Sequence, residues 1–152
     1  MLKIVLLGYM GVGKSTIGKL LAENQKMTWV DLDEFIENRE GKSISELFLE
    51  KGEIYFRKKE SQYLDELLEN SQTQIIVMGG GTPCYANNHL KLKHEKVFSI
   101  YLKASIATLM SRLEAEQEKR PLIANLSKDE LSEFIAKHLF DRSYFYYHAK
   151  HQ

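Results

Sequence analysis

The sequence predicts a three-layer α/β/α domain of the P-loop NTPase type, with one parallel sheet between two layers of helices. Short runs rich in Ile, Val and Leu alternate with longer segments of helical periodicity, which is typical of strand–helix–strand units. The first run leads directly into a glycine-rich loop of the phosphate-binding kind. The chain has 152 residues and no low-complexity segment, internal repeat or evident linker, so we expect a single domain over residues 1–152.

The glycine-rich loop, residues 8–15, matches the pattern G-x-x-x-x-G-K-[ST] at every fixed position. It follows a strand expected over residues 2–7 and precedes a helix expected over residues 14–24, which is the context that a P-loop requires. The alternative is a glycine turn that happens to precede a helix. The apolar face of this helix is expected to carry Ile17, Leu20 and Leu21.

A P-loop binds nucleotide phosphates through its backbone N–H groups and the positive end of the following helix. Lys14 is spaced to reach the β- and γ-phosphates, and the Ser15 hydroxyl is spaced to coordinate Mg²⁺. We therefore expect ATP or GTP as a ligand, and the absence of an Asn-Lys-x-Asp motif argues against a GTPase. The residues expected to bind the nucleotide in this loop are Gly11, Val12, Gly13, Lys14, Ser15 and Thr16.

The remaining elements follow from periodicity and from capping signals. We expect strands over residues 27–32, 74–78 and 96–102. We expect helices over residues 33–40, 43–51, 54–70, 87–94, 105–114 and 126–147. Ser43 and Ser127 are each followed by a glutamate three residues later, as a capping box requires, so each is expected to begin a helix.

Two carboxylates, Asp31 and Asp33, lie at the end of the second expected strand. Because ligands bind beyond the carboxyl ends of parallel strands, these side chains are expected to face the same place as the P-loop. A carboxylate there holds Mg²⁺ or accepts the proton of an attacking hydroxyl. Asp33 is alternatively the N-cap of the next helix, a role that the sequence does not suggest for Asp31.

The third expected strand ends in Gly79, Gly80 and Gly81. These glycines form either a flexible turn or a place where a ligand approaches bare backbone N–H groups. Arg57 follows an apolar stretch and is suited to bidentate recognition of a carboxylate or phosphate. Its alternative role is a surface salt bridge with Glu53 or Glu60.

Two further arginines lie in the second half of the chain. Arg120 belongs to a charged segment, about residues 114–124, that has the composition of a lid over a phosphate site. The alternative for this segment is a solvated loop. Arg142 lies in the last helix among aromatic residues, which alternatively only pack against it.

Charge and composition exclude several classes of function. The 21 basic residues balance the 21 acidic ones, so nothing favours nucleic acid or an anionic membrane as a partner. No apolar run is long enough to span a bilayer, and no signal peptide is recognisable. Cys84 is alone and fits a reducing compartment. We expect a monomeric cytoplasmic protein that acts on a small molecule.

The complete set of motifs resembles shikimate kinase over nearly the whole chain, in order and at fitting spacings. The resemblance implies a nucleoside-monophosphate-kinase-like fold and ATP-dependent phosphorylation of the 3-hydroxyl of shikimate, giving shikimate 3-phosphate and ADP. The residues that carry it are the P-loop, Asp31-Leu32-Asp33, Phe56-Arg57, Gly79-Gly80-Gly81, Arg120-Pro121-Leu122 and Arg142.

The resemblance also implies roles for individual residues. Asp33 is implied to lie near the reacting hydroxyl, with Lys14 and Arg120 around the transferred phosphoryl group. Asp31 is implied to lie near the water shell of Mg²⁺, and Arg112 to stack on the adenine. The implied shikimate-binding residues are Asp33, Arg57, Gly79, Gly80, Gly81 and Arg142.

The chain departs from the family in its last part, because the family usually continues into a fifth strand and an adenine-contacting loop after the last helix. We therefore expect a four-stranded sheet, with the strand over residues 96–102 as an unprotected edge. Two other functions are considered. One is a kinase for gluconate, which is also a carboxylated polyol; the other is a nucleotide-binding module with impaired turnover.

Overall fold

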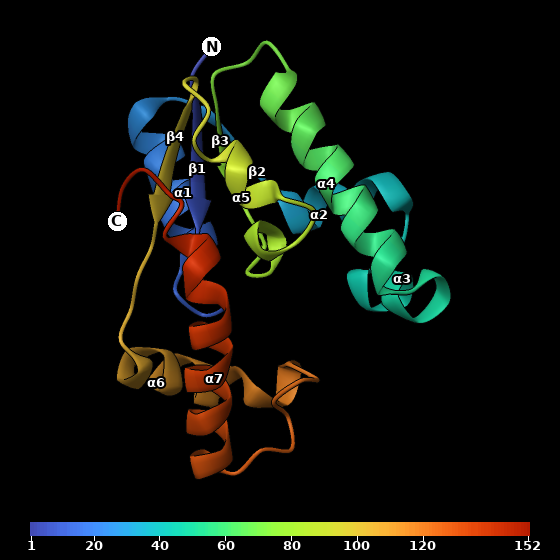
Figure 1. The fold of residues 1–152 in the computed structure, drawn as a ribbon, viewed down its shortest axis with the longest axis vertical. Coiled ribbons are helices and arrows are strands. Elements are labelled where there is room, and N and C mark those ends of the chain that lie inside the picture. The colour runs from blue at the N-terminus through green and yellow to red at the C-terminus, as the bar shows by residue number, and fades with distance from the viewer.

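The computed structural model describes residues 1–152 and is built around one four-stranded, fully parallel sheet in the order β2-β3-β1-β4 (Figure 1). The central strand β1 pairs with β3 on one side and with β4 on the other, with Val5 opposite Ile76 and Ser99. The predicted parallel four-stranded sheet is confirmed. The strands are β1 (Lys3–Leu7), β2 (Thr28–Asp31), β3 (Gln74–Val77) and β4 (Val97–Tyr101).

Helices cover both faces of this sheet and extend below it (Figure 1). The α-helices are α1 (Lys14–Gln25), α2 (Leu32–Glu40), α3 (Ile44–Lys51), α4 (Glu53–Glu69), α5 (Asn88–Lys91), α6 (Ile106–Glu116) and α7 (Lys128–Tyr146). Two short 3-10 helices are η1 (Thr82–Cys84) and η2 (Gln117–Lys119). None of the helices combines the length and the apolar character needed to cross a membrane.

The alternation of side chains along the strands produces two apolar clusters, one on each face of the sheet. On one face, Leu6, Ile75 and Val77 pack with Ala22 of α1. On the other face, the larger cluster joins residues of β1, β3 and β4 to α2, α4, α6 and α7. A sheet with helices on both faces is the predicted three-layer α/β/α arrangement, which is confirmed.

The face that α1 presents to the sheet differs from the predicted one. Ile17 is 40% exposed and Leu20 is 54% exposed, whereas Gly18 and Ala22 are buried. Of the three predicted residues, only Leu21 packs against the apolar cluster under α1, where it is partly buried. A Cβ on Gly18 would lie only 2.6 Å from Cγ2 of Val77 in β3. The helix that follows the P-loop therefore packs on the sheet through its smallest side chains, because its backbone approaches β3 too closely for a larger one.

The two predicted capping boxes are both present, at Ser43 and at Ser127. The helix expected over residues 87–94 is shorter, since α5 contains only four residues. The edge of β4 was expected to be unprotected, but the structure shows that it is partly covered. His151 pairs with Ile100, and its N–H donates to Ser99 O at 3.0 Å while its carbonyl accepts from Tyr101 N at 2.8 Å. The end of the chain thus covers part of this edge.

Gly18→Val tests the close packing of α1 on β3. We expect the free energy of unfolding to fall by about 1–3 kcal/mol, because two additional methyl groups and a Cβ must be accommodated against Val77. Urea unfolding measures it. The matched control is Lys19→Val at the neighbouring exposed position, which should change stability far less. Equal effects of the two substitutions would contradict the packing argument.

Candidate active site

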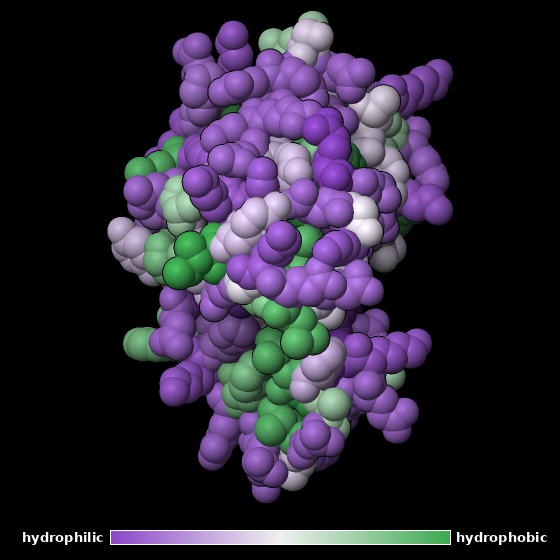
Figure 2. Space-filling view, turned by 90° about the vertical axis from the view of Figure 1, so that its right-hand side faces the viewer, coloured by the Kyte–Doolittle hydropathy of each residue, from purple (hydrophilic) through white to green (hydrophobic).

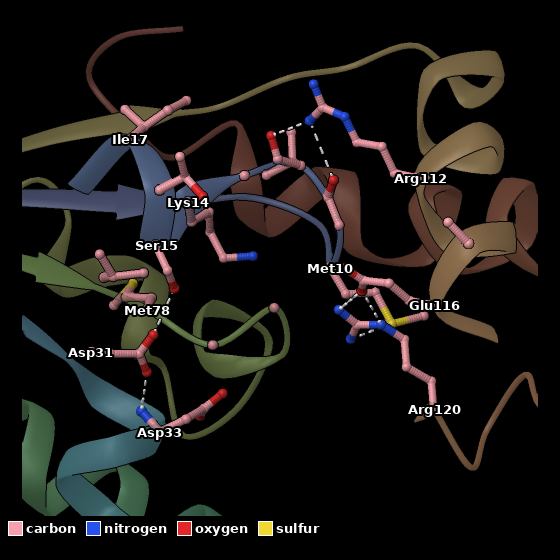
Figure 3. Close-up of a pocket in the computed structure, with 18 residues that line it drawn as sticks. Met10, Lys14, Ser15, Ile17, Asp31, Asp33, Met78, Arg112, Glu116 and Arg120 are labelled. Atoms are coloured by element: carbon pink, nitrogen blue, oxygen red, sulfur yellow. Dashed lines mark hydrogen bonds and ion pairs between the residues drawn. The ribbon is translucent and has the colours of Figure 1, made fainter. Parts of the chain in front are cut away.

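A cavity of about 740 Å³ opens at the carboxyl edge of the sheet, between the P-loop, the β2–α2 junction and α6 (Figure 3). Most of the residues predicted to bind nucleotide, metal or substrate line it. These are Gly11, Val12, Gly13, Lys14, Ser15, Thr16, Asp31, Asp33, Gly79, Gly80, Arg112 and Arg120. Arg57, Gly81 and Arg142 do not line this cavity, although the glycine segment places them next to it, as described below.

Lys14 begins α1 and is held by the P-loop backbone. Its Nζ donates to Gly8 O at 2.7 Å and to Tyr9 O at 3.0 Å. Burial lowers the pKa of Lys14 to about 8, although Asp33 and Asp31 oppose this shift. The positive charge of the Lys14 ammonium group is therefore unfavourable in the free protein. A bound phosphate would supply a negative charge beside it and stabilise the ammonium group.

Asp31 joins the P-loop to α2 through its two carboxylate oxygens. Oδ2 accepts a hydrogen bond from Ser15 Oγ at 2.8 Å (Figure 3). Oδ1 accepts from the backbone N–H groups of Asp33 at 2.9 Å and Glu34 at 3.3 Å, so Asp31 is the N-cap of α2. The sequence interpretation was wrong here, because it considered capping only for Asp33. Helix α2 begins one residue earlier than expected, which moves the cap to Asp31.

Asp33 lies in the first turn of α2 and points into the cavity (Figure 3). Burial raises its pKa to about 6, and the negative charges of Asp31 and Glu60 add to this effect. Lys14 opposes the shift but does not cancel it. Asp33 is therefore a carboxylate with a raised proton affinity, which is the property expected of a general base that works near neutral pH.

Each glycine of the triplet makes room for a charged side chain from another element. A Cβ on Gly79 would lie 2.8 Å from Asp33 Oδ1, one on Gly80 would lie 3.2 Å from Arg142 Nη1, and one on Gly81 would lie 2.9 Å from Arg57 Nη2. The sequence interpretation had considered only a flexible turn or an approaching ligand. The structure adds a different reason, which is that the triplet brings α2, α7 and α4 together at one place.

Arg57 on α4 is held by Glu60, a partner that the sequence suggested only as a surface salt bridge. Nη1 of Arg57 lies 2.9 Å from Glu60 Oε1, and Thr82 Oγ1 donates to the other oxygen at 2.8 Å. The Glu60 side chain is 1% exposed, so this ion pair is buried. Glu53 is also near, with an oxygen 3.7 Å from Arg57 Nε. Glu60 is therefore part of the site, and its spacing of three residues from Arg57 was the available signal.

Arg112 and Arg120 approach the cavity from the side of α6 (Figure 3). Nη1 of Arg112 donates to Val12 O at 2.7 Å, which ties α6 to the P-loop. Arg120 follows η2, and its Nε and Nη2 donate to Glu116 at 3.1 and 2.8 Å. Both guanidinium groups thus lie beside the phosphate-binding loop.

The last helix contributes Arg142 and a tyrosine that sequence reasoning missed. The Tyr146 hydroxyl is part of a fully buried side chain and donates to Gly80 O at 2.6 Å. Tyr146 therefore anchors α7 to the glycine triplet one turn after Arg142. Nothing in the sequence separated this tyrosine from the other aromatic residues of the helix.

A parallel sheet whose first strand runs into a P-loop, with an acidic and several basic side chains across the cavity, defines an α/β kinase of the nucleoside-monophosphate-kinase type. The family model described as shikimate kinase matches residues 10–152. The chain belongs to the shikimate kinase family, as the motifs predicted.

Relatives and solved structures agree with this assignment. A shikimate kinase of Flavobacterium johnsoniae is 57% identical, and the alignment covers 99% of this chain and 87% of the relative. A crystal structure of shikimate kinase from Bacteroides thetaiotaomicron is 36% identical, with a TM-score of 0.91, over 99% of this chain and 84% of that one. Shikimate kinase from Acinetobacter baumannii in complex with shikimate is 29% identical, with a TM-score of 0.85, over 99% and 82%. A gluconokinase from Sinorhizobium meliloti, at 17% identity and a TM-score of 0.54, shares the fold alone.

Asp33→Asn tests how much the ionised carboxylate of Asp33 lowers the free energy of unfolding. A carboxyl whose pKa is raised to about 6 from 3.8 contributes stability below pH 4, and this contribution is lost as the pH rises through 6. The amide removes the ionised form, so we expect the variant to be more stable than wild type at pH 8 by about 1–2 kcal/mol. This is less than the full shift implies, because the amide is also removed from water at this site.

Urea unfolding between pH 4 and pH 8 measures the difference, which should shrink toward pH 4. Glu34→Gln, at the next and exposed position, is the control and should not be stabilised at pH 8 as Asp33→Asn is. A variant that is less stable than wild type at pH 8 would contradict the assignment of Asp33 as an electrostatically costly group.

Proposed function

We propose that this chain transfers the γ-phosphoryl group of ATP to the 3-hydroxyl of shikimate, giving shikimate 3-phosphate and ADP. The observation that carries the proposal is the glycine triplet, which gathers Asp33, Arg57 and Arg142 opposite the P-loop. A hydroxyl acceptor that carries a carboxylate fits this set, because the carboxylate pairs with the arginines and the hydroxyl with Asp33. An acceptor without a carboxylate would leave Arg57 with only its ion pairs to Glu60 and Glu53, and would give Arg142 no anionic partner.

The proposed roles follow the positions of the side chains. Residues 11–16 hold the nucleotide phosphates, and Lys14 moves from the backbone carbonyls to the β- and γ-phosphates. Asp33 orients the acceptor hydroxyl and takes its proton. Catalysis rests on positioning and on neutralisation of charge, because phosphoryl transfer requires little covalent chemistry from the protein.

Mg²⁺ is the metal that the site would hold, with the Ser15 hydroxyl and Asp31 as its protein contacts. These are hard oxygen ligands, and they already lie 2.8 Å apart. The chain has no cluster of three or more His, Cys, Asp or Glu side chains that would hold a metal alone. The ion would therefore share its remaining positions between water and the phosphates, where it neutralises charge on the transferred group.

Arg120 and Arg112 are proposed to complete the nucleotide side of the site, with Arg120 on the transferred phosphoryl group and Arg112 on the adenine. Residues 114–124 are proposed as the lid. Figure 2 shows apolar side chains gathered over the lower part of the molecule, where α6 and α7 lie in Figure 1. Leu122 in this segment is 71% exposed, which supports a surface that is covered when the lid closes.

The remaining properties are proposed from the chain as a whole. Residues 1–152 act as a single kinase domain and as a cytoplasmic monomer. The single cysteine supports a reducing compartment. Burial raises the pKa of the Cys84 thiol to about 11, so it stays protonated and takes no part in the reaction.

The acceptor is tested by ADP release with Mg-ATP, with and without shikimate, and with gluconate in its place. We expect strong stimulation by shikimate and none by gluconate. Lys14→Met should lower the shikimate-dependent rate by about 10²–10³-fold, because the group that stabilises the transferred phosphoryl is lost. Lys19→Met, on the exposed side of the same helix, is the control and should keep the rate. Stimulation by gluconate instead of shikimate would refute the proposed acceptor.

The pH dependence of kcat/KM for shikimate tests the roles of Asp33 and Lys14. Asp33 must be ionised, so activity should rise as the pH passes about 6. Lys14 must be protonated, so activity should fall as the pH passes about 8. The measurement is initial rates with shikimate and Mg-ATP both well below their KM values, so that the profile reports the groups of the free enzyme. A profile that stays flat between pH 5 and pH 9 would contradict both assignments.

A further inference from the structure

We propose that Tyr85 is a positioning residue of the acceptor site, which acts by fixing the guanidinium group of Arg57. This inference rests on the proposed function for its consequence, since Arg57 is there assigned to the carboxylate of the acceptor. The Cζ atom of Arg57 lies 3.9 Å from the centroid of the Tyr85 ring. No sequence motif pointed to Tyr85, which lies 28 positions after Arg57 and outside the helix that carries it.

Hydrogen bonds alone do not hold the Arg57 guanidinium in its place. Nη1 donates to Glu60, whereas the buried Nε has no hydrogen-bond partner. A buried donor without a partner is unfavourable, so packing has to supply what the hydrogen bonds do not. Three aromatic rings surround the group, and Tyr85 is much nearer than Phe56 at 5.2 Å or Phe48 at 6.0 Å. A cation over an aromatic face at this distance is attracted by the ring.

The turn that carries Tyr85 is built at an energetic cost. Tyr85 O accepts a hydrogen bond from Asn88 N at 3.0 Å, and the two residues between them have φ values of +51° and +57°. Asparagine tolerates this left-handed conformation, but Ala86 does not favour it. Strained residues of this kind persist where the surrounding structure fixes them, and they cluster at functional sites.

Buried hydrogen bonds attach this turn to the same helix that carries Arg57. The side chain of Asn88 is fully buried; its Nδ2 donates to Thr82 O at 2.9 Å and its Oδ1 accepts from Ser61 Oγ at 2.9 Å. Ser61 lies one helical turn after Arg57 on α4. The hydrogen bond between Asn88 and Ser61 therefore fixes the position of the Tyr85 ring relative to Arg57, because both depend on α4.

Arg57 and Tyr85 also face a groove on the surface, and Glu53 in this groove is a competing partner for Arg57. Arg57 and Tyr85 line a groove of about 660 Å³ together with Glu53 and Ile54. An oxygen of Glu53 is already 3.7 Å from Arg57 Nε and is half exposed. Without the ring, the guanidinium is free to turn toward Glu53 and away from Gly81. Tyr85 thus keeps the arginine beside the glycine triplet, where the acceptor carboxylate is expected.

Substitutions at Tyr85 separate the ring from the space that it fills. Tyr85→Phe keeps the aromatic face, so its KM for shikimate should stay within about twofold of wild type. Tyr85→Leu fills much of the space without an aromatic face, and Tyr85→Ala does neither. For both, the KM for shikimate should rise about tenfold, while the KM for ATP and kcat change less than about twofold. The double variant Glu53→Gln with Tyr85→Ala should recover part of the loss.

Ile54→Ala is the matched control, because Ile54 lines the same groove and is 89% exposed. It should leave both KM values unchanged. An unchanged KM for shikimate in Tyr85→Ala would overturn the proposal. An equal rise of both KM values together with a lower melting temperature would also overturn it, since that pattern marks a purely structural residue.

A second readout does not depend on turnover. The Nε–H resonance of Arg57 in a proton–nitrogen correlation spectrum, identified by its loss in Arg57→Lys, should be shifted upfield by the ring in wild type and in Tyr85→Phe. The shift should disappear in Tyr85→Leu, and its persistence there would overturn the proposal. If wild type lacks shikimate-dependent turnover, the proposed function fails, and this spectrum still decides whether Tyr85 fixes Arg57.

Discussion

The active-site edge of the sheet holds oppositely charged side chains close together where water is partly excluded, and the rest of the site depends on this arrangement. The carboxyl ends of β1 and β2 bring Lys14, Asp31 and Asp33 to one edge of the sheet, and α4 adds the buried pair of Arg57 and Glu60. Burial raises the pKa of Asp33 and lowers that of Lys14 in the free protein. Both shifts show that the site is destabilised in the absence of ligands, as expected of a site that is arranged for a charged reaction rather than for stability.

Neighbouring elements hold the charged side chains in place before any ligand binds. Asp31 is fixed by the α2 N-terminus and by Ser15, Arg112 by the P-loop carbonyl groups, and Arg57 by Glu60 and Tyr85. The glycine triplet allows three of these elements to meet without a side chain between them. Such preorganisation removes much of the entropic cost of ordering long side chains when substrates bind. The fold therefore contributes to the proposed catalysis mainly by fixing positions.

The sequence predicted the sheet, the P-loop and the family because these depend on local patterns and fixed spacings. Capping at Asp31 was missed because the start of α2 shifts by one residue, which periodicity does not resolve. The prediction of which side of α1 is buried was wrong for Ile17 and Leu20, because close backbone packing on β3 favours Gly18 over larger apolar residues. Glu60 was suggested by its spacing from Arg57, but as a surface partner rather than a buried one. Tyr146 and Tyr85 act through contacts between elements that are distant in sequence, and Tyr146 is also one of several similar residues in its helix. Contacts of this kind can be recognised only in the folded structure.

Asp33 carries a raised proton affinity because burial removes its carboxyl from water and because Asp31 and Glu60 add negative charge. The most direct measurement is a titration of the Asp33 side-chain carboxyl by carbon NMR in the free protein. We expect a midpoint at about 6, well above the ordinary value of 3.8. A midpoint close to 3.8 would show that the carboxyl is well solvated or fully paired, and would contradict a raised proton affinity of Asp33.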